Sequence, residues 1–231
     1  MAKHIGIVAV SPEGAALFYR QILREASHIL EPHQHPRVSL HNEPLALYID
    51  AVREGDWHKV GDLLRRSAEI LARCGAELCL TPDNAVQHGV HLAEAGSPIP
   101  WVMMPELVAK AVEADKRRVV GLIGTKMVTT GSTYQTHLGL RGIQVLAPEP
   151  DDAERVDEII FKELIYGDIR PASQAVVLSI IRHLKERGCE GVILGCSEAP
   201  LLVTPENAPL PIYDAAELLA KGAVQRASLP S

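Results

Sequence analysis

A cysteine and an aspartate stand at two similar places in this 231-residue sequence, each close behind a short apolar run. Cys196 ends the stretch GVILGC at 191–196, and Asp83 ends the stretch AELCLTPD at 76–83. Runs of this kind are typical of buried strands, so both side chains should stand at a strand's C-terminal tip, where the next helix begins. A thiol there gains thiolate character, because a helix N-terminus favours an anion. Cys196 is therefore a candidate base or nucleophile.

Each candidate also has a purely structural interpretation. Free cysteine is among the most buried residue types, so Cys196 could be a core thiol. An aspartate between a proline and a helix is a common N-cap, and Thr81 is a second candidate for the reactive position in that turn. For Cys74, Cys79 and Cys189, in a helix end or a strand interior, we expect a packing role.

Four predicted strand tips offer groups that bind small anions. Hydroxyl residues and glycines at strand-to-helix turns expose backbone N–H groups, which hold carboxylates or phosphates without arginine. The residues that we expect to bind a substrate at these tips are Ser11, Thr81, Asn84, Thr125, Lys126, Ser197 and Glu198.

Motifs for common cofactors are missing from the sequence. The stretch GLIGTK at 121–126 lacks the GxxxxGK spacing of a nucleotide-binding loop, and no GxGxxG follows the first predicted strand. His33 and His35 have no accompanying cluster of metal ligands, which indicates a solvated loop. We therefore expect neither a metal nor a cofactor.

The pattern of elements predicts an α/β fold. Continuous apolar strands alternate with amphipathic helices, which indicates mainly parallel sheets flanked by helices. The order repeats at an offset of about 115 positions: HIGIVAVSPEGA matches RVVGLIGTKMVT, and LARCGAELCLTPDN matches LKERGCEGVILGCSE. We predict two pseudo-symmetric lobes with an active-site cleft between them. The first lobe comprises 1–105 and a returning C-terminal helix in 211–231, and the second comprises 106–210.

Composition excludes several partners. The net charge of −6, without a basic stripe, disfavours nucleic-acid binding, and no apolar run approaches the length of a membrane span. The first ten residues do not form a secretory signal, so we expect reduced cysteines and a cytoplasmic protein.

Five stretches, in order, resemble the aspartate/glutamate racemase family of the Asp/Glu/hydantoin racemase superfamily. They are IGIVAVSPEGAALFYRQI, GAELCLTPDNAVQH, GLIGTKMVTTGSTYQTHL, IIFKELIYGDIRPASQA and GVILGCSEAPLLV. The resemblance implies a two-lobed homodimer that acts on an amino acid without pyridoxal phosphate, with one acid/base group from each lobe flanking the α-carbon. It also implies that Cys196, followed by Ser197 and Glu198, is the second-lobe acid/base residue.

The sequence departs from the family's pattern at three places. The first-lobe motif usually reads cysteine or threonine and then Asn-Thr-x-His, whereas residues 83–87 read Asp-Asn-Ala-Val-Gln. Asn84 is retained, Ala85 takes the threonine's place beside the substrate, and Asp83 takes the acid/base position. The Gly-Gly-Met turn is Ala-Val-Ser at 9–11, and a Ser-Arg pair is Ser-Gln at 173–174.

The sequence therefore predicts an isomerase: a racemase or epimerase of an acidic amino acid of the aspartate or glutamate type. Cys196 and Asp83, or Thr81 in its place, would act on opposite faces of the α-carbon. One alternative is an enzyme similar to the arylmalonate decarboxylases, with Cys196 alone as proton donor. Another is a protein that binds a small acid without turnover.

Overall fold

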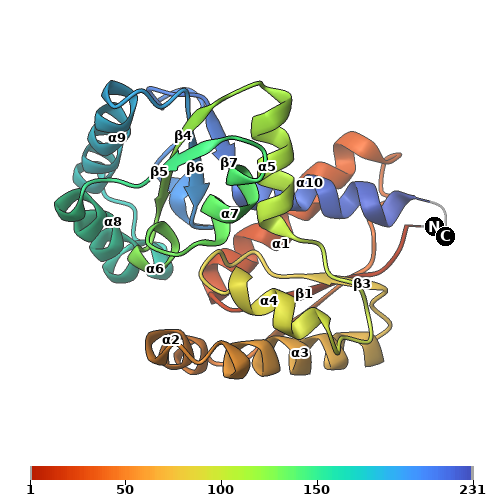
Figure 1. The fold of residues 1–231 in the computed structure, drawn as a ribbon. Coiled ribbons are helices and arrows are strands. Elements are labelled where there is room, and N and C mark those ends of the chain that lie inside the picture. Colours follow the sequence, from red (N-terminus) through yellow and green to blue (C-terminus); the bar gives the residue numbers. More distant parts are fainter. Residues whose placement is uncertain (1, 230–231) are drawn as a thin grey trace. The chain divides into compact units, whose positions relative to one another are not determined.

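The structure, a computed structural model, describes residues 2–229 and divides into two compact units (Figure 1). The first unit comprises the chain up to Met104 together with the segment from Ala216 onward, and the second comprises Pro105–Ala215. Each unit therefore has its own sheet and its own core, and the first is built from two separate parts of the sequence.

The first unit has a parallel sheet of three strands in the order β2-β1-β3. On its other side β3 has one further parallel pairing, an isolated bridge between Cys79 and Trp101. Helices α3 and α4 pack on each other, and the core lies between them and the sheet. The elements of this unit are β1 (Ile5–Ala9), α1 (Pro12–Ile29), β2 (Val38–Asn42), α2 (Leu45–Glu54), α3 (Trp57–Arg73), β3 (Leu78–Leu80), α4 (Gln87–Glu94) and α10 (Ala215–Ser228).

The second unit has a parallel sheet of four strands in the order β5-β4-β6-β7. Helices α8 and α9 pack on each other and on β4, and Figure 1 shows them side by side on the same flank of the sheet. The elements of this unit are α5 (Met104–Ala114), β4 (Val119–Gly124), α6 (Lys126–Thr129), α7 (Thr133–Gly139), β5 (Gln144–Leu146), α8 (Pro150–Lys162), the 3₁₀ turn η1 (Leu164–Tyr166), α9 (Pro171–Glu186), β6 (Gly191–Gly195), the 3₁₀ turn η2 (Ala199–Leu201) and β7 (Ile212–Asp214).

The two units repeat one topology, as the order β2-β1-β3 in the first corresponds to β5-β4-β6 in the second. The repeat extends to backbone contacts at the start of the central strands. Glu77 accepts a hydrogen bond from the backbone N–H of His4 at 2.8 Å, and Glu190 accepts one from Arg118 at 2.7 Å. The predicted fold class, two α/β lobes with parallel sheets, is confirmed.

Two short helices follow β4 in place of one long helix. The sequence 125–140 forms α6 and α7, separated at residues 130–132. The hydroxyls of Thr129 and Thr130 both donate back to the carbonyl of Lys126, at 3.3 and 2.7 Å. Such bonds compete with a regular helix, and Gly131 adds a residue of low helix propensity. The division keeps α6 short at the end of β4.

No helix in the described part of the chain, residues 2–229, is long and apolar enough to span a membrane. The longest helix, α1, has 18 residues and alternates buried and exposed positions, as expected for a helix that covers a sheet.

Candidate active site

The thiol of Cys196 lies directly after β6, at the end of a strand whose five residues are all buried. At this point Gly195 pairs with Gly124 of β4. A Cβ on Gly124 would lie 2.8 Å from the carbonyl oxygen of Gly195, a distance that side chains do not tolerate. Thr125 and Cys196 directly follow this last pair, so they stand at the ends of neighbouring strands.

The Cys196 side chain is buried and donates a hydrogen bond to a buried carboxylate. Its Sγ lies 3.0 Å from Oε2 of Glu198, and the residues are 7% and 3% exposed. Glu198 turns back toward the thiol because a 3₁₀ turn, η2, begins at the following residue. The thiol hydrogen is thus directed at the Glu198 carboxylate.

The turn after β3 in the first unit presents Asp83. Its Oδ1 accepts a hydrogen bond from the backbone N–H of Ala85 at 3.0 Å, in a turn that precedes α4. The N-cap residue of α4 is Val86, so Asp83 is not the cap of this helix. The side-chain amide of Gln87 donates to the carbonyl oxygens of Thr81 and Asp83, at 3.1 and 3.0 Å. These two bonds hold the backbone of the turn.

The internal repeat aligns Asp83 with Cys196. Before each strand a glycine with a left-handed backbone ends the preceding helix: Gly75 at φ +90° and Gly188 at φ +93°. Asp83 and Cys196 each follow their glycine by eight positions, 75 to 83 and 188 to 196. By the same count Thr81 corresponds to Leu194, which is a core residue inside β6.

The remaining predicted residues take different roles. Ser11 accepts a hydrogen bond from the backbone of Gly14 at 3.2 Å and so caps α1. Asn84 and Ser197 are buried beside the two acid/base candidates, each 7% exposed. Ala85 contributes its backbone N–H to Asp83. The predicted binding residues thus gather at the C-terminal ends of the strands of their own units.

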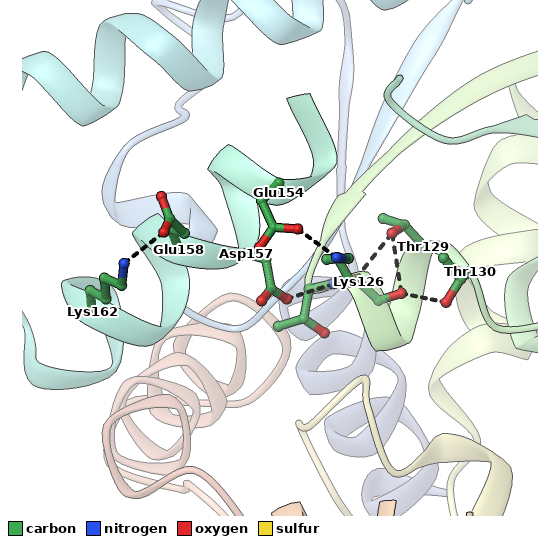
Figure 2. A network of polar contacts seen from close by, with 8 residues as sticks. Lys126, Thr129, Thr130, Glu154, Asp157, Glu158 and Lys162 are labelled. Atoms are coloured by element: carbon green, nitrogen blue, oxygen red, sulfur yellow. Dashed lines mark hydrogen bonds and ion pairs between the residues drawn. The ribbon is translucent and has the colours of Figure 1, made fainter. Parts of the chain in front are cut away.

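Lys126 is directed away from the strand end. Figure 2 shows its side chain reaching Glu154 of α8, with Nζ 2.5 Å from Oε2, while its backbone N–H donates to Asp157 at 2.7 Å. The Glu154 carboxylate raises the pKa of this lysine, whose side chain is 49% exposed. Its charge is therefore engaged at the surface of the second unit.

Three residues that lie near the predicted site residues were not selected from the sequence. Gln87 fixes the turn of Asp83, and its place in the family's histidine position was the only signal in the sequence. Asp214, a buried acid at the end of β7, follows a short apolar run as the other site residues do. Asp157 takes its role from the position of α8, which no local pattern reveals.

The other three cysteines do not lie at the C-terminal ends of strands. Burial raises the pKa of Cys79 and of Cys189, which lie in β3 and just before β6, and Cys74 is exposed at the end of α3. Among residues 2–229 no group of three or more histidine, cysteine or acidic side chains could hold a metal ion.

Fold and site together define a protein of two repeated α/β units, with Asp83 and Cys196 at equivalent positions after a strand of each unit. The chain belongs to the Asp/Glu/hydantoin racemase family, whose model matches residues 7–223. The members of this family act on small amino-acid substrates.

Known relatives share both the fold and part of the sequence. A structure from Yersinia pestis, described as a candidate Asp/Glu racemase, is 27% identical with a TM-score of 0.86 and covers 97% of this chain and 99% of that one. A Pyrococcus horikoshii aspartate racemase homologue is 26% identical with a TM-score of 0.85, over 99% and 100% of the two chains. The glutamate racemase of Shouchella clausii is 26% identical over 166 residues, which are 71% of this chain and 55% of that enzyme.

Proposed function

We propose that this protein is a racemase or epimerase of an acidic amino acid, of the aspartate or glutamate type, that works without pyridoxal phosphate. The single observation that carries the proposal is the alignment of Asp83 with Cys196 in the internal repeat. A two-base mechanism needs one proton-transferring group for each face of the α-carbon, and the repeat supplies one such group per unit.

In the proposed mechanism Asp83 and Cys196 exchange roles. In one direction ionised Asp83 removes the α-proton and the Cys196 thiol delivers a proton to the opposite face. In the other direction the Cys196 thiolate removes the proton and protonated Asp83 returns one. Asn84 and Ser197, buried next to the two groups, are suited to orient the substrate by hydrogen bonds. We further propose that the enzyme is a cytoplasmic homodimer.

The hydrogen bond from Cys196 to Glu198 favours a second candidate. A thiol held by a carboxylate is a better proton donor than base, so the same site suits an enzyme in which Cys196 only protonates a carbanion, as in arylmalonate decarboxylation. A binding protein for small acids on the same fold remains the third candidate.

The test is proton exchange at the α-carbon. The protein is incubated in D₂O with each enantiomer of aspartate and glutamate, and the α-proton signal is followed by NMR together with optical rotation. A racemase loses that signal with every enantiomer it uses, and Cys196→Ser abolishes the loss.

The product separates the candidates from one another. Carbon dioxide release from a substituted malonate, without exchange of amino acids, would support the decarboxylase instead. Ligand binding that survives in Cys196→Ser, with no exchange in the wild type, would support the binding protein.

A further inference from the structure

Thr125 has a buried hydroxyl that the protein itself does not use. The residue is 8% exposed, and its Oγ1 has no hydrogen-bond partner within residues 2–229. A buried hydroxyl without a partner is costly, and most such groups in proteins are satisfied. The unused hydroxyl of Thr125 therefore points to a partner from outside the chain.

The Thr125 hydroxyl also takes no part in capping α6. Thr125 is the N-cap residue of α6, a position where a threonine hydroxyl ordinarily accepts a backbone hydrogen bond. Here the Thr125 side chain makes no capping bond, and the N–H of Val128 is bonded to the backbone carbonyl of Thr125 at 3.0 Å. The first N–H of the helix, that of Lys126, donates to Asp157 of α8 at 2.7 Å, as Figure 2 shows. In the first unit the corresponding N-cap, Ser11, does accept a capping bond, from Gly14 at 3.2 Å.

The position of Thr125 connects it with the thiol. It follows β4 as Cys196 follows β6, and the last residues of these strands, Gly124 and Gly195, are paired. Both residues therefore stand at the C-terminal edge of one sheet, at the ends of neighbouring strands. A small molecule that contacts Cys196 there lies next to the strand end that carries Thr125.

Negatively charged side chains at this edge of the sheet indicate which ligand group the hydroxyl would bind. Two buried carboxylates, Glu198 and Asp214, stand after β6 and at the end of β7, and the buried phenol of Tyr134 lies close enough to Asp214 for that carboxylate to help raise its pKa. The nearest cation in sequence, Lys126, is paired with Glu154. An acidic edge favours a positively charged group, and a hydroxyl oxygen accepts hydrogen bonds from an ammonium group.

We propose that Thr125 Oγ1 accepts a hydrogen bond from the α-ammonium group of the substrate, and so orients the α-carbon toward Cys196. This proposal rests on the proposed action on an amino acid. Its test is Thr125→Val, which keeps the shape of the side chain and removes only the hydroxyl. Binding is measured by calorimetry for two matched pairs: aspartate with succinate, and glutamate with glutarate, which lack the amino group.

We expect Thr125→Val to weaken binding of the amino acid about tenfold or more, and to leave its desamino partner unchanged. The variant should keep the melting temperature of the wild type or exceed it by up to about 4 °C, because an unsatisfied hydroxyl has been removed. The matched control is Thr129→Val. The Thr129 hydroxyl donates to the carbonyls of Thr125 and Lys126, so its loss should lower the melting temperature and leave binding unchanged.

Three results would overturn the inference. If the variant lost equal affinity for the amino acid and its desamino partner, the hydroxyl would contact a carboxylate instead. If the affinity for both were unchanged, Thr125 would make no contact with the ligand. A lower melting temperature with unchanged affinity would give Thr125 a structural role. Failure of the proposed function looks different, since the wild type would then bind the amino acid without α-proton exchange. A wild type that binds no member of either pair overturns both.

Discussion

Replacing Glu198 with glutamine tests how the protein sets the state of its thiol. In the wild type the Glu198 carboxylate accepts a hydrogen bond from the Cys196 thiol, with Sγ 3.0 Å from Oε2, and both residues are buried. Glutamine keeps the size of the side chain and removes its negative charge, and its amide is able to donate to a thiolate. The substitution should therefore make Cys196 ionise at lower pH.

The magnitude follows from the distance. Two unit charges 3.0 Å apart at an effective dielectric constant of about 20 repel by about 5 kcal/mol, which corresponds to about 4 pKa units as an upper bound. Relaxation of the side chains and entry of water lower this value. We expect the midpoint of Cys196 ionisation to fall by about 1–2 pH units in Glu198→Gln.

Thiolate absorbance near 240 nm, titrated against pH, measures this midpoint directly when the curve of the matching Cys196→Ser protein is subtracted. The control is Glu190→Gln, which makes the same charge change at the opposite end of β6, where Glu190 accepts from the backbone of Arg118. Exchange in D₂O should change in parallel, with a gain for the enantiomer whose proton Cys196 removes. Equal midpoints in the wild type and Glu198→Gln would refute the reasoning.

Three further predictions concern the first unit. Asp83→Asn should lower α-proton exchange by at least about a hundredfold by removing one acid/base group, whereas Thr81→Val should retain most of it, and the reverse order of the two rates would transfer the role to Thr81. Burial raises the pKa of Tyr48 to about 12, so the stability that this phenol contributes is complete below pH 10 and is lost as the pH rises toward 12. Tyr48→Phe should flatten that part of the curve of unfolding free energy against pH, and an unchanged slope would contradict the assignment. Gly89→Ala should lower the unfolding free energy by about 1–3 kcal/mol in urea titrations, because its Cβ would lie 2.5 Å from Cγ1 of Val60; an unchanged midpoint would show that α3 and α4 move apart freely.

The sequence was sufficient for the fold class because continuous apolar strands, such as GVILG at 191–195, have few arrangements other than a covered parallel sheet. It also placed Cys196 at a strand end. It left Asp83 and Thr81 as alternatives, since β3 is only three residues long and its end is not visible in the residue pattern. In the structure, the glycine turns before β3 and β6 allow the two strands to be aligned, and this alignment pairs Asp83 with Cys196.

Contacts between distant segments were beyond any reading of the sequence. The hydrogen bond from Lys126 to Asp157 joins residues 31 positions apart, and no pattern near Thr125 indicates that its hydroxyl has no partner among the described residues. The bond between Cys196 and Glu198 is local, but it depends on the backbone turning into η2 at once after the strand. The two amide bonds of Gln87 likewise depend on the shape of the turn above α4.

The division of the chain between the units has a consequence for the order in which the protein is completed during synthesis. The second unit is one continuous segment, Pro105–Ala215, so all of its strands are synthesised before the last helix of the first unit. The backbone N–H of Lys3, just before β1, is bonded to the carbonyl of Ala227 at 2.8 Å, which joins residues more than two hundred positions apart. In order of synthesis the sheet that leads to Cys196 is therefore complete before the unit that carries Asp83.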